Sequence, residues 1–336
     1  VPIYFHAKNS KLFYFLSKIN DTLRTAKLPS ELLTQKKRVI KVRIGKPISV
    51  AEQNEYESIE EYSEFLRKKT YMLANPFEKD NNCLNTNPLK GHKSPKKIVT
   101  PASSEKMIRE VENLRTLDCR LLQSKNYEVF FAKAKDIPNI LHEIGRLREI
   151  TFREVGEGTN ESIDLDKYDQ YYRHLFLWDD ETNKIAGAYR MGLGCEIYPK
   201  YGMDGFYLNG LFRFEPELHE MLHKSIEMGR AFIIKEYQQK PMPLFLLWRG
   251  IIHTTLHYPE HKYLLGGVSI SNQFSDFSKS LMIEFMKSHY YDPYIAQYVH
   301  PKKEYKVKLK DADKDFVFNE TDADLNKFDK IIDELE

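Results

Sequence analysis

Apolar and polar positions along the chain follow two periods, and the period changes from segment to segment. Runs of roughly four to eight apolar or alternating residues predict strands, whereas apolar residues spaced three or four apart predict helices. The strands predicted in the longer part of the chain are Tyr127–Ala132, His174–Trp178, Lys184–Gly192 and Tyr263–Ile270. The helices predicted there are Ile137–Phe152, Leu244–Leu256 and Asp276–His289. Helices and strands therefore alternate, which predicts an α/β fold.

The same pattern divides the chain into four parts. Residues 1–75 form a first unit, with strands predicted at Val1–Phe5 and Arg38–Ile44 and helices at Asn9–Ile19 and Ile59–Leu73. Residues 76–125 are predicted to be a polar linker, rich in Asn, Pro, Lys and Ser, followed by a connecting helix that Ser104 caps. Residues 126–310 are the main domain, and residues 311–336 are an acidic tail, predicted to be a solvated helix or disordered. The apolar start at Val1 predicts that a longer polypeptide precedes these residues.

Charge and cysteine content narrow the class of protein. Formal net charge is only +2 over 336 residues, so no global field indicates a nucleic-acid partner. Three cysteines, at positions 83, 119 and 195, are widely spaced and odd in number, which is typical of a reducing compartment. No apolar run reaches the length of a membrane span. We therefore expect a cytoplasmic protein, with peripheral contact at the inner face of the cell membrane left open.

An acidic run offers the first candidate chemistry. Asp164, Asp166 and Asp169 lie within six positions. Three carboxylates at this spacing repel one another, so the pKa of at least one should rise. A carboxylate with a raised pKa is suited to deprotonate an amine. The simpler interpretation is a solvated acidic loop, and composition alone favours it.

Arginines near apolar residues offer a second set of candidates. Glu227 and Arg230 flank Gly229, and an arginine there could hold a carboxylate or phosphate through two hydrogen bonds. Arg148 and Phe152 lie near a predicted helix end that Arg153 and two glycines follow, a pattern that could close over an anion. Arg190 ends the predicted return strand. The simpler interpretation of Glu227 and Arg230 is an ordinary ion pair, and the two residues alone favour it.

Three histidine patterns compete with these candidates. His219-Glu220-Met221-Leu222-His223 matches the H-E-x-x-H pattern of zinc peptidases, but no extension of that motif follows. His253, His257 and His261 are spaced by four, although Pro259 interrupts a helix before the third. His174 and Asp179 match the H-x4-D dyad of glycerolipid acyltransferases, and we interpret this match as coincidence because it runs from a strand into a turn. We expect no metal site.

Six motifs in one order carry a resemblance to a known family. They are Arg148-x3-Phe152, Asp164-x-Asp166-x2-Asp169, Gly187-Ala188-Tyr189-Arg190, Glu227-Met228-Gly229-Arg230, Leu247-Trp248-x-Gly250-Ile251 and Leu265-Gly266-Gly267-Val268-Ser269. In this order they resemble the ornithine- and glycine-lipid N-acyltransferases, haemolysin-like relatives of the acyl-homoserine-lactone synthases. The resemblance covers most of residues 126–310 and implies a GNAT-like fold. Asp164 stands where the synthases often have Glu.

Residues 1–75 resemble a different family. The motifs are Val1-Pro2-Ile3-Tyr4-Phe5, Asn9-Ser10, Leu23-Arg24-Thr25 through Leu28-Pro29, Glu31-Leu32-Leu33 and Ile44-Gly45-Lys46-Pro47-Ile48. They resemble the carboxyl-terminal part of the lysophospholipid (glycerol-phosphate) acyltransferases. The catalytic dyad of that family lies upstream of these motifs, so these residues are not expected to catalyse O-acylation by themselves.

The resemblance implies transfer of a 3-hydroxyacyl chain to the α-amino group of an amino acid such as ornithine or glycine, the first step of aminolipid synthesis. The acetyl-CoA loop Q/R-x2-G-x-G/A is not evident, which fits acyl-loaded carrier protein as the donor better than free acetyl-CoA, and acyl-CoA is left open as an alternative donor. No bound cofactor is expected. Lys133 and Lys135 are basic residues that could meet the acidic carrier protein.

The roles follow from this reaction. Asp164 is assigned proton removal, and Glu227 and Arg230 complete the catalytic set. The residues assigned to substrate binding are Arg148, Phe152, Asp166, Asp169, Arg190 and Trp248. Two alternatives come from other classes of protein: a zinc peptidase built on His219 and His223, and a non-catalytic lipid-binding module.

Overall fold

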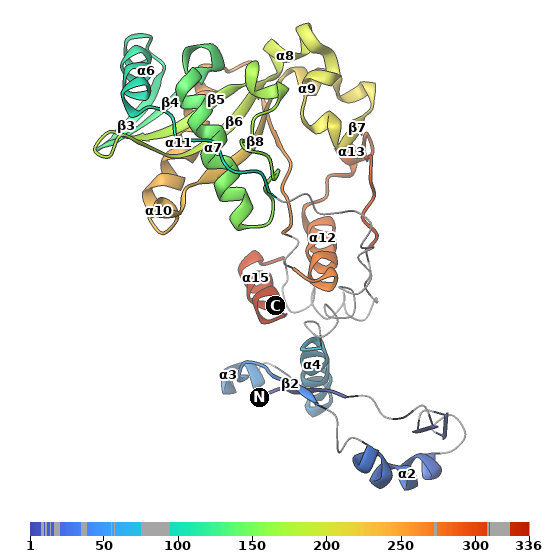
Figure 1. The fold of residues 1–336 in the computed structure, drawn as a ribbon. Helices are drawn as coiled ribbons and strands as arrows, with labels where there is room; N and C mark the ends of the chain where they lie inside the picture. Colours follow the sequence, from blue (N-terminus) through green and yellow to red (C-terminus); the bar gives the residue numbers. More distant parts are fainter. Residues whose placement is uncertain are drawn as a thin grey trace. The chain divides into compact units, whose positions relative to one another are not determined.

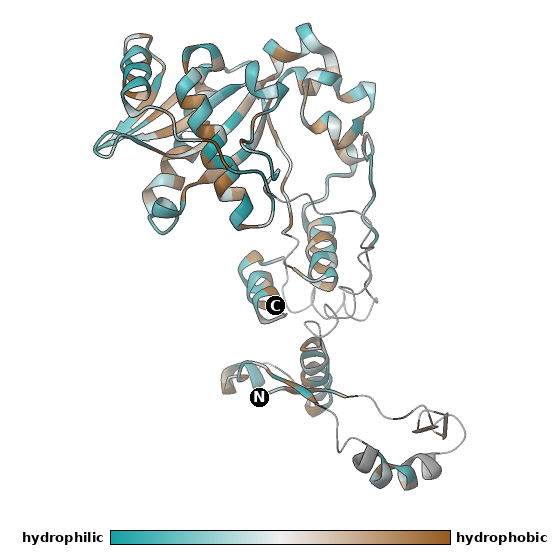
Figure 2. Cartoon of the chain, in the orientation of Figure 1, coloured by the Kyte–Doolittle hydropathy of each residue, from teal (hydrophilic) through white to brown (hydrophobic). Residues whose placement is uncertain are grey.

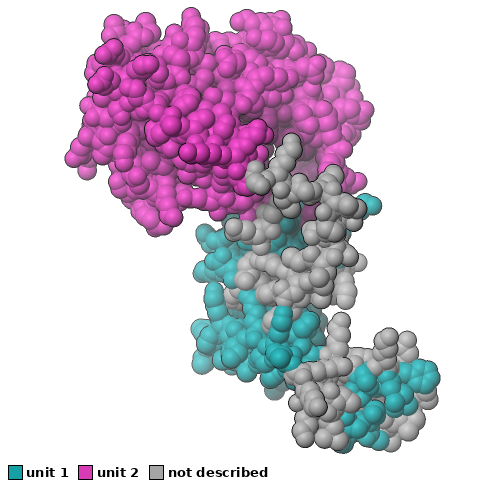
Figure 3. Space-filling model, viewed as in Figure 1, with its two compact units in different colours: residues 1–89, 274–290, 306–336 teal, residues 90–273, 291–305 magenta. Residues whose placement is uncertain are grey.

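The structure of the chain is a computed structural model with two compact units, which Figure 3 distinguishes by colour. Unit 1 comprises residues 1–89, 274–290 and 306–336, and unit 2 comprises residues 90–273 and 291–305. The residues that the structure describes are 1–7, 10, 12–13, 15–16, 21–34, 39–54, 56, 58–74, 95–271, 274–307, 309 and 323–335. Most of the predicted helix Asn9–Ile19 and of the predicted linker lies outside them.

Unit 2 is built on a six-stranded sheet with the order β3-β4-β5-β6-β8-β9 (Figure 1). The strands are β3 (Arg120–Ser124), β4 (Tyr127–Lys133), β5 (Arg173–Asp179), β6 (Lys184–Leu193), β8 (Ser225–Ile233) and β9 (Tyr263–Gly266). Neighbours are antiparallel as far as β8, whereas β8 and β9 run parallel. Helices lie between several of these strands along the chain, so the α/β class is confirmed.

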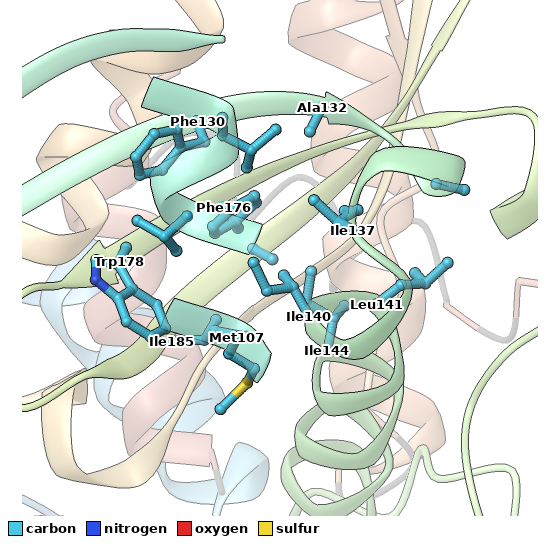
Figure 4. Close-up of a cluster of buried hydrophobic side chains, with 14 of the residues drawn as sticks. Met107, Phe130, Ala132, Ile137, Ile140, Leu141, Ile144, Phe176, Trp178 and Ile185 are labelled. Carbon is cyan, nitrogen blue, oxygen red and sulfur yellow. The ribbon is translucent and has the colours of Figure 1, made fainter. Parts of the chain in front are cut away.

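Two helical layers cover the two faces of this sheet. The helices α6 (Ser104–Thr116) and α7 (Pro138–Glu154) pack on one face, where α7 contributes Ile140 and Ile144 to a core with Phe130, Phe176 and Trp178 (Figure 4). On the opposite face, α11 (Pro241–His257) packs Leu246, Leu247 and Ile251 against Val129, Leu175 and Met191. Successive residues of a strand alternate between these two faces, so the sequence position of a strand residue determines which layer it meets.

Strands β8 and β9 pair over only four residues, and past the last pair the two strands are no longer hydrogen-bonded to each other. The two parallel strands pair from Ser225 with Tyr263 to Met228 with Gly266. Beyond that point β8 continues to Ile233 while pairing only with β6. The register between β6 and β8 also shifts between Ala188 and Arg190, which indicates a β-bulge. Bulges are over-represented beside active sites because they redirect a side chain.

A smaller helical region joins β6 to β8. It comprises α8 (Gly194–Tyr201), η4 (Gly202–Gly205), η5 (Leu208–Gly210), β7 (Phe212–Phe214), η6 (Pro216–Leu218) and α9 (His219–His223). The remaining elements of unit 2 are η2 (Ala134–Asp136), η3 (Lys167–Gln170), α10 (Lys235–Gln238), α13 (Pro293–Ala296) and β10 (Val299–Pro301), and β10 pairs with β7. Buried Tyr172, Ile197, Phe206 and Leu222 hold the region together. It places residues 205–208 over the sheet.

Unit 1 joins segments from both ends of the printed sequence. Its elements are β1 (Ile3–His6), α2 (Asp21–Thr34), β2 (Lys41–Ile44), α3 (Val50–Gln53), α4 (Ile59–Met72), α12 (Asp276–Tyr290) and α15 (Leu325–Leu335). One apolar cluster contains Ile48 and Phe65 together with Phe285 of α12 and Phe328 of α15. The rings of Phe285 and Phe328 stack with centroids 4.0 Å apart.

Several expectations differ from this arrangement. The acidic tail was expected to be solvated, but Phe328 and Ile332 of α15 are buried, because helical spacing places both on one face. Helix α12 was assigned to the main domain, yet it groups with unit 1. Strand β3 lies within the predicted linker, and Ser103 rather than Ser104 is at the amino end of α6, without a side-chain cap. Within the described residues, no helix is both long and apolar enough to cross a membrane.

Candidate active site

The acidic run 164–169 folds onto α7 and surrounds a buried arginine. The guanidinium of Arg148, only 1% exposed, donates to both carboxylate oxygens of Asp169, from Nη1 at 3.1 Å and from Nη2 at 3.0 Å. Its Nε lies 3.0 Å from Oδ2 of Asp164, and Nη2 also donates to the backbone carbonyl of Asp164. The two hydrogen bonds fix the carboxylate of Asp169, whereas Asp164 is held through its backbone carbonyl and its carboxylate makes an ion pair without a hydrogen bond.

Local hydrogen bonds give the run its shape. Asp166 begins the short helix η3, and its side chain accepts the Tyr168 N–H at 2.8 Å. Asp169 accepts the Asp166 N–H at 2.8 Å in return, which completes a capping box. The run contacts α7 closely at Gly145, whose carbonyl accepts the Asp164 N–H at 3.2 Å. A Cβ on Gly145 would lie 2.6 Å from the side chain of Leu165.

We expect Gly145→Ala to push the acidic run away from α7. Overpacking of this kind destabilises a protein by about 1–3 kcal/mol. Thermal and denaturant unfolding of the variant measure the loss. Gly210→Ala is the matched control, because a Cβ at Gly210 would meet nothing within 4 Å and Gly210 has no positive φ. Equal stability of the two variants would contradict the close packing at Gly145.

Arg190 joins the network from the sheet. Its side chain is 2% exposed, and Nη1 lies 2.7 Å from Asp166 and 3.2 Å from Asp169. Three tyrosine rings surround the guanidinium, with centroids 5.3–5.5 Å from it: Tyr168, Tyr172 and Tyr207. The contacts with two carboxylates and three rings hold the acidic run in place.

Arg230 is the more accessible cation of the group. Its side chain is 23% exposed, and Nη2 lies 3.6 Å from Asp164 and 3.9 Å from Asp166, longer than hydrogen bonds. The Nε of Arg230 is buried without a hydrogen-bond partner. Its backbone has φ 51°, a left-handed conformation that costs energy for a non-glycine residue and occurs often at functional sites. We call Arg148, Asp164, Asp166, Asp169, Arg190 and Arg230 the Asp–Arg network.

Glu227 lies three positions before Arg230, but its hydrogen-bond partners are not members of the Asp–Arg network. The carboxylate is buried and accepts the N–H groups of Tyr207 at 3.0 Å and Leu208 at 2.6 Å. The hydroxyl of Tyr172 donates to it as well. The expectation that Glu227 pairs with one of the arginines is not met by a direct ion pair within 4.0 Å among the described residues. Glu227 instead fastens the 205–208 segment over β8.

The network separates the pKa values of its carboxyl groups. Burial raises the pKa of Asp164, and the charges of Arg148 and Arg230 offset this only in part. Burial also raises the pKa of Glu227 despite its three hydrogen bonds. Burial opposes the charged form of Asp169, but the charge and hydrogen bonds of Arg148 outweigh it and lower the pKa of Asp169 to about 2. Asp164 is thus the carboxyl group of the run whose pKa moves toward that of a general base.

His174 contacts the backbone of the acidic run, a role that the sequence did not indicate. Its Nε2 lies 3.0 Å from the carbonyl of Asp169, and burial lowers the pKa of His174 to about 4. Asp179, its partner in the H-x4-D pattern, lies at the other end of the seven-residue strand β5 and accepts from Asn126 and Tyr237. The two side chains therefore do not form a dyad. This agrees with the interpretation of the H-x4-D match as a coincidence.

One predicted binding residue, Trp248, lies on the other face of the sheet from the network. Trp248 is on α11, which covers the opposite face of the sheet from Arg190 and α7, and its side chain is exposed. The assignment of Trp248 to substrate binding stays a prediction, and helical spacing turns this side chain outward while Leu247 packs inward. Phe152 packs against the core on the α7 side. Arg153 does not close over an anion, since its Nε donates to Glu149 at 2.6 Å.

The zinc-peptidase pattern does not assemble a ligand set. Helix α9 is five residues long, Glu220 pairs with Lys224 at 2.6 Å, and His219 Nδ1 lies 3.2 Å from the Tyr198 hydroxyl. Across the described residues, the one group of three metal-ligating side chains is Cys195, Glu260 and His261. Neither histidine of the motif belongs to it. The zinc-peptidase alternative is therefore not supported.

Tyrosines form the part of the site that sequence reasoning missed. Tyr168, Tyr172 and Tyr207 contact Arg190, and Tyr207 also lies under Arg230 at 5.4 Å. Tyr172 is buried and bonded to Glu227, which with burial raises the pKa of its hydroxyl. The only signal was the frequency of Tyr near the acidic run, since the region between β6 and β8 brings Tyr207 from a distant part of the chain.

Comparisons with known proteins agree with this architecture. A family model described as an acetyltransferase (GNAT) domain matches residues 147–248, which include every member of the Asp–Arg network. The chain is 32% identical over 206 residues to a glycine N(alpha)-acyltransferase of Bacteroides thetaiotaomicron, covering 58% of this chain and 60% of that protein. A glycine N(alpha)-acyltransferase of Phocaeicola vulgatus is also 32% identical over 206 residues, covering 58% of this chain and 63% of that protein.

The chain thus spans about three fifths of the length of these two relatives. No solved structure matches it significantly. The resemblance of residues 1–75 to lysophospholipid acyltransferases stays a prediction. For unit 2, the matched model and the mixed sheet lead to one conclusion: residues 147–248 are similar to an acetyltransferase (GNAT) domain.

Proposed function

We propose that this chain is an N-acyltransferase that moves a fatty acyl group from a thioester donor to the α-amino group of a small amino acid, glycine first among the candidates. The observation that carries the proposal is the pairing of Asp164, whose burial raises its pKa, with the half-buried cation Arg230 at the strand split. The names of the two relatives support glycine as the acceptor. Ornithine, which the sequence resemblance implies, is the second acceptor to test.

The charges of the network support this choice of acceptor. An amino acid brings one carboxylate and one amine to the site. Arg190 and Arg148 each contact carboxylates of the run at 2.7–3.2 Å and are almost fully buried, whereas Arg230 is partly exposed and has only long contacts with its carboxylates. Arg230 is thus the cation of the network that can turn to an incoming carboxylate. The amine would then lie near Asp164.

The reaction needs one proton removed and one returned. The neutral amine attacks the thioester carbonyl, the new C–N bond forms and the C–S bond breaks. Asp164 accepts the amine proton, directly or through a water molecule, and the leaving thiolate takes a proton in turn. Because Asp164 is buried, its carboxylate is poorly solvated and is a stronger base than an exposed aspartate.

The split between β8 and β9 supports a position for the donor. Past Met228 the outer edge of β8 is no longer paired with β9, so its backbone groups are available to an extended chain. The amide-containing arm that carries an acyl group on carrier protein or coenzyme A is such a chain. A Cβ on Gly229 would meet nothing within 4 Å, so the space beside this strand is open. Acyl carrier protein is the proposed donor, in the first step toward an aminolipid.

Direct assay tests the proposal. Purified chain is incubated with acyl-loaded carrier protein or acyl-CoA and a panel of amino acids that includes glycine and ornithine. Mass spectrometry detects the N-acyl amino acid, and a thiol reagent measures the free thiol released in equal amount. No N-acyl product from any acceptor with either donor would refute the proposed function and favour a non-catalytic lipid-binding module.

We expect Arg230→Gln to weaken binding of the amino acid. Loss of a charge-assisted hydrogen bond costs about 1.5–3 kcal/mol, which raises the KM for glycine roughly 10- to 100-fold. The measurement compares KM values for glycine and for a simple amine without a carboxylate. The KM for the amine should be the same in both proteins. An equal rise for both acceptors would mean that Arg230 acts elsewhere than on the carboxylate.

A further inference from the structure

Helix α11 has an uncovered apolar face. Its inner side packs Leu246, Leu247 and Ile251 into the core of unit 2. Its outer side presents large apolar side chains that are 37–71% exposed: Met242, Leu244, Phe245, Trp248, Ile252 and Leu256. A helix that is apolar on both sides needs a cover on each of them. Contiguous exposed apolar surface of this kind marks an interaction site.

Charge shows which kind of surface fits this face. The seventeen residues of α11 include no Asp or Glu, and their one permanent charge is Arg249. Lys240 stands directly before the helix at its amino-terminal cap. Arg249 lies 5.9 Å from the ring of Phe245, so the cation borders the apolar stripe. An apolar and aromatic surface that carries cations and no carboxylate is complementary to the headgroups and acyl chains of an anionic bilayer.

We propose that the outer face of α11 docks unit 2 on an anionic lipid surface, with Phe245, Trp248 and Ile252 inserted among the lipids and with Lys240 and Arg249 at the headgroups. Tryptophan is enriched at this depth because its ring is apolar and its N–H is polar. The network lies on the opposite face of the sheet, so docking leaves it accessible to a water-soluble amino acid. If the proposed function holds, the amphiphilic product forms close to the bilayer that would receive it.

Vesicle binding tests the proposal without any substrate. The full chain is sedimented with vesicles of phosphatidylcholine alone and of phosphatidylcholine with phosphatidylglycerol. We expect binding to the anionic vesicles, weaker binding to the neutral ones, and weakening by salt. Ile252→Glu should lower the affinity by about tenfold or more, because it places a charge among the lipid chains. Leu117→Glu is the matched control, because Leu117 is also half exposed but lies at the end of α6, on the other face of the sheet.

Tryptophan emission gives a second readout. The chain has two tryptophans, and Trp178 is buried in the core whereas Trp248 is 47% exposed. Lipids with brominated acyl chains should therefore quench Trp248 selectively, and Trp248→Phe should abolish the quenching. Circular dichroism confirms that each variant is folded. Emission that brominated lipids leave unchanged would contradict insertion of this face.

Other outcomes overturn the proposal and point elsewhere. Absence of sedimentation with anionic vesicles, or equal binding of Ile252→Glu and Leu117→Glu, would refute it. If Ile252→Glu binds vesicles like the wild type but raises KM for acyl carrier protein, the face belongs to that protein instead. Vesicle binding and acyl transfer are measured separately. A chain that binds lipid without transferring acyl groups would therefore refute only the proposed function.

Discussion

Replacing Asp164 by Asn is expected to lower kcat for acyl transfer by about 10²- to 10⁴-fold, the usual contribution of a general base. The amide keeps the shape of the carboxyl group but cannot accept the amine proton. The wild type should lose activity as pH falls through the pKa of Asp164, which burial places above the ordinary value of 3.8. In Asp164→Asn this acidic limb of the pH–rate profile should disappear. The profile and single-turnover rates measure both effects.

Two further variants separate catalysis from structure. Asp164→Glu restores a carboxylate at the same position and should recover part of the lost rate. Asp166→Asn is the matched aspartate control, since Asp166 is 29% exposed and holds Arg190 rather than the proposed amine site. If Asp164→Asn retains the rate and the pH profile of the wild type, Asp164 is not the base. Glu227, whose pKa burial also raises, would then be the next residue to test.

Replacing Arg148 by Met is expected to destabilise unit 2 by about 3–5 kcal/mol, because a buried carboxylate would lose its main partner. Arg190 would be the one cation left beside Asp169, and the distant Arg230 the one left beside Asp164, among the described residues. Denaturant unfolding measures the loss. Lys184→Met is the control, since its pair with Glu236 is exposed, at 51% and 63%, and such pairs contribute about 0–1 kcal/mol.

The pH dependence of unfolding checks the same pair. The pKa of Asp169 is lowered to about 2 in the folded chain, so its charged form stabilises the fold above pH 4. That stabilisation should be lost as pH falls from about 4 to about 2 in the wild type. In Arg148→Met, the charge and hydrogen bonds that offset the effect of burial on Asp169 are lost, so the pKa of Asp169 rises. The stability difference between the two proteins should therefore narrow at low pH, and a constant difference would contradict the assignment.

The pattern of apolar residues predicted an element correctly where the turn residues beside it indicated the same boundaries. The predicted strand His174–Trp178, the turn after it and the return strand Lys184–Gly192 lie within one residue of β5 and β6. Strand β3 was missed, because an edge strand that reads Arg-Leu-Leu-Gln-Ser has too little apolar character to separate it from a linker. Met221–Gln239 gave mixed signals, since it contains a short helix, a bulged strand and the left-handed Arg230.

The site could be predicted as a set of residues but not as a set of contacts. Ordered motifs indicated all six members of the Asp–Arg network. They could not indicate that Arg148 takes both oxygens of Asp169, or that Arg190 is enclosed by three rings, because these partners meet only through the fold. The outward orientation of Trp248 could not be predicted for a related reason. Its motif lies on α11, but this helix is apolar on both sides. Periodicity therefore cannot show which of its side chains point inward and which point outward.

The composition of the unit 1 cluster has a consequence for synthesis on the ribosome. Phe65 emerges early, whereas its cluster partners Phe285 and Phe328 emerge after the whole sheet of unit 2. At about 5–20 residues per second, the delay is on the order of tens of seconds. During that time unit 2 has the residues it needs to close its sheet, while the apolar side chains of the early segment lack their partners. Nascent chains of this protein should therefore recruit chaperones through residues 1–75, and releasing the chain before α15 is made should leave that segment exposed.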